Sequence, residues 1–159
     1  MRNAKIKVGI SSCLLGEKVR YDGTDKHDHF LMETLGRKFE CLGICPEVEC
    51  GLGVPRETMH LEGNPENPRL VTDYTKVDHT DRILKWTRNK LVELENEGLG
   101  GFIFKRNSPS CDADTGIFAS QFIRRFALIP VESEDRLHDP ETIKRFIENV
   151  FEYERKKRK

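Results

Sequence analysis

No apolar run in this sequence approaches the roughly 20 residues that a membrane-spanning helix needs. The first residues lead directly into a strand-like segment and lack the pattern of a secretory signal peptide. The chain also lacks a net charge, because 27 acidic residues balance 27 basic ones. We therefore expect a cytoplasmic protein with no membrane partner and no global electrostatic attraction to nucleic acid.

Repeats, low-complexity segments and domain linkers are also missing from the sequence. Its 159 residues match the size of one domain, and 36% of them are hydrophobic, which is enough for one core. We therefore treat residues 1–159 as a single domain. The only sizeable basic run covers residues 155–159, and we expect it to be a flexible, solvated tail.

The five cysteines do not fit a disulfide framework, because their number is odd and cytoplasmic thiols stay reduced. No histidine lies in a motif beside any of them, so a hydrolase with a cysteine nucleophile ranks last among the interpretations. The remaining interpretations are buried apolar thiols and metal ligands.

Strand and helix patterns alternate along the chain. Short apolar segments that end at turn residues predict strands at residues 6–10, 40–44, 101–104 and 127–131. Helical periodicity predicts helices at residues 30–39, 80–97 and 117–126, and a last helix with Asp139 as its N-cap. Residues 58–61 and 70–72 can pair as a hairpin. This order predicts an α/β fold, with a largely parallel, Rossmann-like sheet and helices on both faces.

Three cysteines, Cys13, Cys45 and Cys111, each follow the carboxyl end of a predicted strand. In a parallel sheet these ends share the edge at which ligands bind, so the three thiols can meet at one point. Each also lies in a loop whose backbone N–H groups can stabilise a thiolate. Cys41 begins a strand and is interpreted as a core residue. Cys50 shares a loop with Cys45 and is either a fourth ligand or a structural thiol.

Three thiolates alone do not identify the metal. Zinc would keep an open fourth position, as catalytic zinc does. A cubane [4Fe–4S] cluster has four irons, so three cysteines would leave one iron open to act as a Lewis acid on a substrate. At this level both a zinc site and an iron–sulfur site remain possible.

Three ordered motifs resemble those of the DUF523 family and together span most of the chain. The first comprises residues 10–16 and 19–23, the second Cys45-Pro46-Glu47 with residues 51–56, and the third Lys105 with Ser108-Pro109-Ser110-Cys111. The family includes thiouracil desulfidases, which carry a [4Fe–4S] cluster held by three cysteines. The resemblance implies that Cys13, Cys45 and Cys111 hold this cluster here, and that Glu47 and Ser108 are the acid–base residues.

The same resemblance implies a desulfidase that removes sulfur from a thiolated nucleobase such as 2-thiouracil. The thiocarbonyl sulfur would bind the open iron, and Glu47 would take a proton from the attacking water. Further polar side chains of the motifs are expected to serve substrate binding: Ser12, Arg20, Tyr21, Asp22, Arg56 and Lys105. The alternative function is a non-catalytic zinc- or cluster-binding module that acts with a partner protein.

Two features distinguish this chain from the usual family pattern. Asp112 follows the third cysteine, where the family usually has Gly, and we expect it to place negative charge beside the site. Residues 136–151 resemble the subgroup in which this domain precedes a second domain, DUF1722. That similarity implies a DUF1722-type partner domain on another chain as one possible arrangement.

Overall fold

Four strands of the computed structural model, which describes residues 5–158, form one entirely parallel sheet. Their order is β2-β1-β5-β6, so β1 and β5 are the central pair. The strands are β1 (Ile6–Ser11), β2 (Phe39–Ile44), β5 (Gly101–Phe104) and β6 (Val131–Ser133). The predicted α/β fold with a parallel sheet is confirmed.

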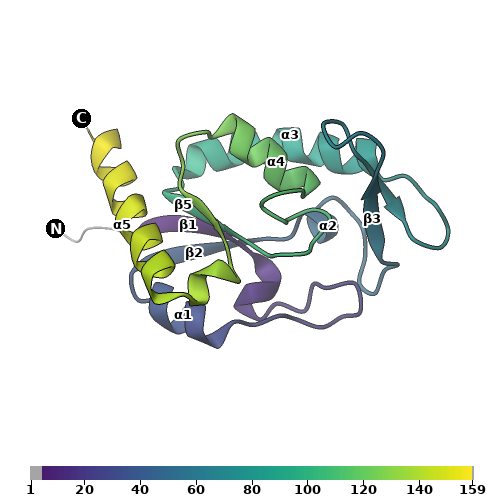
Figure 1. Cartoon of the computed structure of the whole chain (residues 1–159). Coiled ribbons are helices and arrows are strands. Elements are labelled where there is room, and N and C mark those ends of the chain that lie inside the picture. Colours follow the sequence, from purple (N-terminus) through teal and green to yellow (C-terminus); the bar gives the residue numbers. More distant parts are fainter. Residues whose placement is uncertain (1–4, 159) are drawn as a thin grey trace.

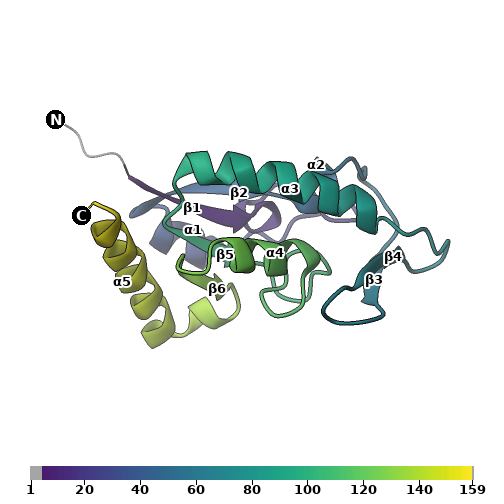
Figure 2. The same cartoon turned by 90° about the horizontal axis from the view of Figure 1, so that it is seen from above.

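Helices cover both faces of this sheet, as predicted (Figures 1 and 2). α1 (His29–Leu35) and α5 (Pro140–Lys157) contribute to the core on one face. α3 (Thr80–Glu97) and α4 (Ile117–Arg125) contribute to the core on the other. No helix within residues 5–158 has the length and apolar character needed to cross a membrane.

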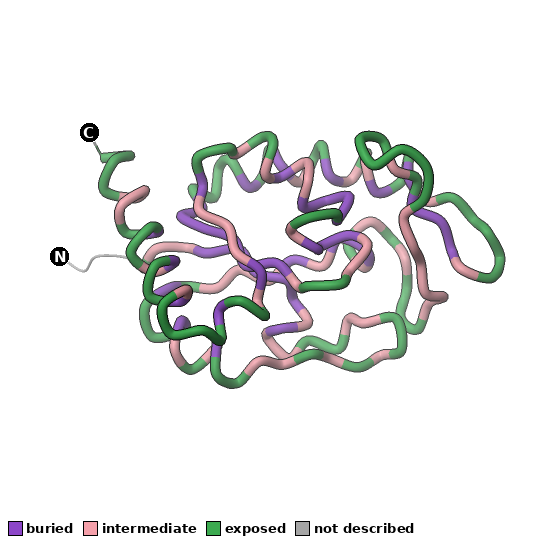
Figure 3. Tube along the Cα trace, in the orientation of Figure 1, coloured by how far each residue is buried: buried purple, intermediate pink, exposed green. Residues whose placement is uncertain are grey.

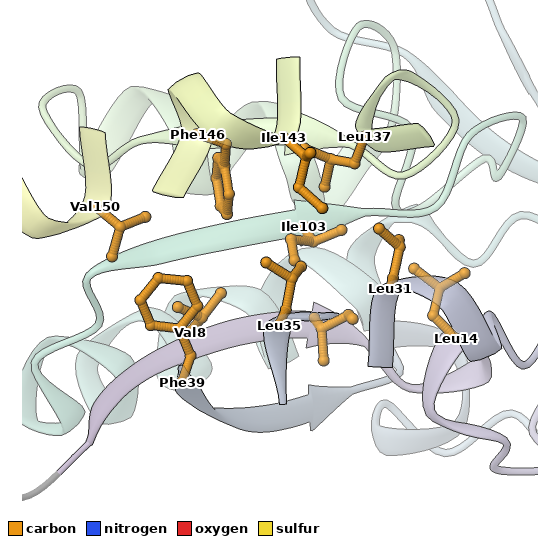
Figure 4. Packing of buried hydrophobic residues seen from close by; sticks show 11 residues of the cluster. Val8, Leu14, Leu31, Leu35, Phe39, Ile103, Leu137, Ile143, Phe146 and Val150 are labelled. Carbon is orange, nitrogen blue, oxygen red and sulfur yellow. The ribbon is translucent and has the colours of Figure 1, made fainter. Parts of the chain in front are cut away.

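The side chains of β5 alternate between these two cores, because successive residues of a strand point to opposite faces. Phe102 and Phe104 pack with the aromatic residues of α4, whereas Ile103 belongs to the core beneath α1 and α5. Figure 4 shows side chains of α1 and α5 facing one another around Ile103. Burial accordingly follows the central strands in Figure 3.

Capping fixes the start of α5 as the sequence predicts. The Asp139 carboxylate accepts the backbone N–H of Thr142 at 2.9 Å, and Pro140 occupies the first turn. Ile143, Phe146 and Val150 then turn one apolar face toward the sheet.

The path of the chain favours a ligand site at the edge of the sheet where the strands have their carboxyl ends. It leaves β1 for the outer strand β2 and then returns to the opposite side of β1 to form β5. Ligand sites in such sheets open where the strand order reverses. A separate antiparallel hairpin of β3 (Met59–Glu62) and β4 (Arg69–Thr72) lies at the end of the molecule opposite α5 (Figure 1).

Two predicted elements differ from the structure by more than one residue. The helix predicted at residues 30–39 ends at Leu35, because Gly36 is a poor helix former and the chain must turn into β2. The strand predicted at residues 127–131 instead spans Val131–Ser133. Leu128 is exposed in a turn, and Pro130 has no N–H for a ladder hydrogen bond.

The basic run at the chain end joins α5, which continues to Lys157. Cations in a last helical turn interact favourably with the partial negative charge of the carboxyl terminus of the helix. The expected flexibility of this segment stays a prediction, and Lys159 lies outside the described residues.

Candidate active site

A cavity of about 400 Å³ opens at the carboxyl ends of β1, β2 and β5. Cys13, Cys45 and Cys111 all line it. Cys13 lies in η1 (Ser12–Leu15) directly after β1, Cys45 is the N-cap of α2 (Pro46–Glu49), and Cys111 lies in the loop after β5. The structure therefore brings the three cysteines to one site, which is the arrangement that the order of strands and loops predicts.

Burial raises the pKa of all three thiols. The pKa of Cys45 rises to about 11, and that of Cys111, which is only 5% exposed, rises further. For Cys13, the charges of Lys105 and Arg20 oppose the effect of burial. The thiols also affect one another: a thiolate at Cys13 raises the pKa of Cys45, and a thiolate at Cys45 raises that of Cys111. A bound metal centre would compensate these charges and hold the sulfurs as thiolates.

Three cysteine thiols on one cavity are the kind of donor set that holds an iron–sulfur cluster. Sulfurs that share a tetrahedral zinc lie within about 4 Å of one another, given Zn–S bonds of about 2.3 Å. Within residues 5–158, no three His, Cys, Asp or Glu side chains are grouped tightly enough to hold a single metal ion. Cysteines that bind different irons of one cluster have wider spacing, and three of them line this cavity.

Glu47 enters the same cavity from the first turn of α2. Its Oε1 accepts the Nε–H of Arg56 at 2.9 Å, and its Oε2 accepts the hydroxyl proton of Ser110 at 2.8 Å. The side chains of Arg56 and Glu47 are only 11% and 12% exposed. Both carboxylate oxygens are thus held, one by an ion pair and one by a hydroxyl.

Ser108 organises the loop that carries the third cysteine. Its Oγ accepts the backbone N–H of Ser110 at 3.2 Å and that of Cys111 at 3.0 Å. The Oγ atoms of Ser108 and Ser110 are 3.1 Å apart. Ser108 lines the cavity, but the serine that contacts Glu47 is Ser110.

Five of the six predicted substrate-binding side chains line the cavity: Ser12, Arg20, Tyr21, Arg56 and Lys105. Asp22 does not. Its carboxylate instead accepts the backbone N–H and the hydroxyl of Thr24, because Asp side chains close such local turns. The backbone N–H of Arg56 donates to the carbonyl of Tyr21 at 2.8 Å, which joins these two parts of the cavity wall.

Asp112 does not line the cavity, contrary to the expected charge beside the site. Its carboxylate accepts the backbone N–H of Asn107 at 2.7 Å, of Asp114 at 2.9 Å and of Thr115 at 3.3 Å. Burial opposes ionisation, but these N–H groups outweigh it and lower the pKa of Asp112. The residue that replaces the usual glycine therefore stabilises the loop from within.

The two other cysteines lie outside the cavity lining. Cys41 packs against the core beneath α1 and α5, as predicted. The thiol of Cys50 donates to the carbonyl of Glu47 at 3.3 Å, and its side chain contacts a small cluster around Leu70 and Ile83. This position favours the structural interpretation of Cys50 over a fourth ligand.

Two serines of the site were missed by sequence reasoning. Both belong to the family motifs, Ser11 to the first and Ser110 to the third, but the sequence assigns a role to neither. Ser11 Oγ accepts the backbone N–H of Lys105 at 3.0 Å, and a hydrogen bond from Ser11 to the Cys111 sulfur opposes the effect of burial on its pKa. Both residues are buried. Each lies within two positions of a predicted cysteine ligand, which is the signal that the sequence offers.

Comparison with known proteins identifies the family. The model of the 2-thiouracil desulfurase family matches residues 8–134, which include all three cysteines. The chain belongs to this family. The solved structure of the [4Fe–4S]-dependent thiouracil desulfidase TudS (DUF523Vcz) is similar, with 32% sequence identity and a TM-score of 0.68. The match covers 84% of this chain and 93% of the TudS chain. A search of curated proteins gave no match.

Proposed function

We propose that this 2-thiouracil desulfurase family member is an iron–sulfur-dependent desulfidase that removes sulfur from a thiolated nucleobase such as 2-thiouracil. The name of TudS describes that protein as [4Fe–4S]-dependent. In this chain, Cys13, Cys45 and Cys111 would hold such a cluster. The observation that supports this proposal most directly is the shared cavity, because three thiols and one fixed carboxylate line it together. Its volume of about 400 Å³ lies in the range of small-molecule sites.

The cluster, when bound by three cysteines, supplies an iron without a protein ligand, which is a Lewis acid for a thiocarbonyl group. Glu47 supplies the base. Each of its oxygens can accept about two hydrogen bonds, and one bond to each is taken by Arg56 and Ser110. A further acceptor position remains on each oxygen, where an attacking water can donate and then lose its proton.

The polar rim supplies binding groups for the rest of the substrate. Tyr21 lines the cavity beside Arg20, whose guanidinium lies 5.4 Å from the Tyr21 ring centroid. An aromatic ring next to a cation suits contact with a flat, polar heterocycle. The amine of Lys105 lies 3.3 Å from a carboxylate oxygen of Glu134, which holds this residue at the other side of the opening. We propose that Arg20, Tyr21 and Lys105 orient the substrate. Ser108 would support the acid–base chemistry by holding the loop that carries Ser110 and Cys111.

Anaerobic reconstitution followed by a sulfide-release assay tests the function. We expect a brown protein with about four irons and four sulfides per chain, as a cubane cluster requires, and release of sulfide from 2-thiouracil with formation of uracil. A colourless protein that binds one zinc and releases no sulfide would favour the alternative, a non-catalytic module. Cys41→Ser is the matched control for loss of a thiol outside the cavity.

A cytoplasmic location is part of the proposal, because reducing conditions keep the ligand thiols free for the metal. A DUF1722-type partner on another chain also remains a proposal. Co-purification of the full chain with a co-expressed DUF1722 domain would test it, and elution of the two as separate peaks in size-exclusion chromatography would argue against it.

A further inference from the structure

We propose that Ser110 is a positioning residue for Glu47, an inference that rests on the function proposed above. Its hydroxyl donates to Glu47 Oε2 at 2.8 Å and joins the loop after β5 to α2, across 63 positions of the sequence. Ser110 is only 2% exposed, so its hydroxyl is shielded from bulk solvent. Arg56 holds the opposite oxygen at 2.9 Å. The carboxylate therefore cannot rotate without breaking one of these two interactions.

Ser108 fixes the direction in which Ser110 donates. Two backbone N–H groups, of Ser110 and Cys111, already occupy the acceptor lone pairs of Ser108 Oγ. The hydroxyl of Ser108 is then left to donate to Ser110 Oγ, 3.1 Å away. Ser110 in turn directs its own proton to Glu47. The resulting chain runs from Ser108 through Ser110 to the carboxylate, and each bond polarises the next.

The backbone of Ser110 is itself held in place by α4. Its carbonyl accepts the N–H groups of Phe118 at 3.0 Å and Ala119 at 3.1 Å, at the amino end of that helix. The approach is so close that a Cβ added to Gly116 would lie 2.6 Å from the Ser110 carbonyl oxygen. The position of the hydroxyl is therefore set by the main fold and not by a free loop.

This arrangement assigns a catalytic effect to Ser110 through Glu47. A general base works only when its free lone pair points at the proton that it must take. Ser110→Ala frees the carboxylate to turn and leaves one oxygen without its buried donor. We expect kcat to fall by about 10–100-fold, the effect of one hydrogen bond to a charged group, with KM changed by less than about threefold.

A double-mutant cycle separates this role from a structural one. Kinetics are compared for wild type, Ser110→Ala, Glu47→Gln and the double variant, each at equal iron and sulfide content. If Ser110 acts through Glu47, its loss costs much less in the Glu47→Gln background. If the fold-losses in kcat of the two single variants multiply in the double variant, Ser110 does not act through Glu47 and the proposal is wrong. Ser120→Ala is the control, because it also removes a partly buried serine hydroxyl, one that donates to the carbonyl of Ile117 within α4.

A second measurement does not depend on turnover. The infrared carboxylate band that Glu47→Gln removes should shift in Ser110→Ala and stay in place in Ser120→Ala, while Ser110→Thr keeps the hydroxyl and should keep the band. An unshifted band in Ser110→Ala would refute the contact. If wild type releases no sulfide from any thiolated base, the proposed function fails, whereas this band still decides the role of Ser110 toward Glu47.

Discussion

Nε of Arg56 lies 2.9 Å from Oε1 of Glu47, and both side chains are almost fully withdrawn from solvent. Because Glu47 is held at the cavity by a charge that is itself buried, neither partner can be removed without consequence for the other. The pair connects the segment before the hairpin to the helix that follows the second cysteine. It therefore contributes both to the stability of the cavity wall and to the orientation of the proposed base.

Arg56→Met should lower the free energy of unfolding by about 2–4 kcal/mol, because a carboxylate stays behind without its partner. Adding Glu47→Gln to this variant should restore part of the loss, since the unpaired charge is then gone. Urea unfolding at equal iron content measures both effects. Arg69→Met is the control, because it breaks an exposed pair with Asp78 and should cost about 1 kcal/mol or less. A double variant no more stable than Arg56→Met would contradict the ion-pair argument.

Glu47→Gln should reduce kcat for sulfide release by about 10²–10⁴-fold, the usual contribution of a general base. The amide keeps the shape of the side chain but cannot take a proton from water. Iron and sulfide content should match wild type, because the three cysteines are untouched. Glu95→Gln, which alters an exposed partner of Arg125 on α3, should keep full activity. Unchanged turnover in Glu47→Gln would remove this residue from the reaction.

Replacement of single cysteines by serine should divide the five thiols into two groups. Cys13, Cys45 and Cys111 line the cavity, so each of their serine variants should lose most of the reconstituted iron. Cys41→Ser and Cys50→Ser should keep it, since their thiols lie in the core clusters outside the cavity. Iron analysis and the visible absorption of anaerobic samples provide the measurement. Iron loss in Cys50→Ser would instead support its role as a fourth ligand.

Asp112→Ala should destabilise the loop of the third cysteine, by about 1–3 kcal/mol in the free energy of unfolding. The reason is that three backbone N–H groups lose the carboxylate that now satisfies them. Asp114→Ala is a suitable comparison, because its exposed carboxylate pairs only loosely with Arg106, at 3.8 Å. Equal unfolding midpoints for the two variants would show that Asp112 has no stabilising role.

The meeting of Cys13, Cys45 and Cys111 could be predicted because strand order and chain direction are global features that local patterns reveal. A short apolar segment followed by a polar loop predicts a strand end, and parallel strands bring such ends to one edge. The family resemblance added Glu47 and Ser108. Neither source placed Ser110 next to Glu47, since that contact joins the loop after β5 to α2, and only the folded chain brings the two together.

Local turn geometry explains the other differences. Asp22 matches a family motif, but whether its carboxylate turns into the cavity or onto Thr24 depends on backbone angles that no periodicity encodes. Asn107 likewise adopts a positive φ of 64°, which turns the chain just before Ser108. Asn tolerates this conformation better than most residues. The sequence thus predicts which loops form the site, whereas the direction of each side chain follows from turns within those loops.

The pH dependence of hairpin stability provides the last test. Hydrogen bonds to Asp73 and then Glu62 raise the pKa of His60 above its ordinary value of 6.5. A raised pKa in the folded state means that protonated His60 stabilises the fold fully below pH 6.5 and that this contribution disappears as the pH rises through the raised value. His60→Gln should therefore be less stable than wild type near pH 6, and the difference should narrow at a pH above the raised pKa of His60.

Chemical unfolding of both proteins at the two pH values measures this difference, and Asp73→Asn should remove most of it by removing the main partner of His60.

The hairpin matters to the site because Thr58, which lines the cavity, donates its hydroxyl to the same Asp73 carboxylate. Loss of the ion pair at high pH should therefore loosen this wall before the sheet unfolds, visible as faster amide exchange at residues 58–62 than in β1. Equal exchange rates in the two segments would contradict this coupling.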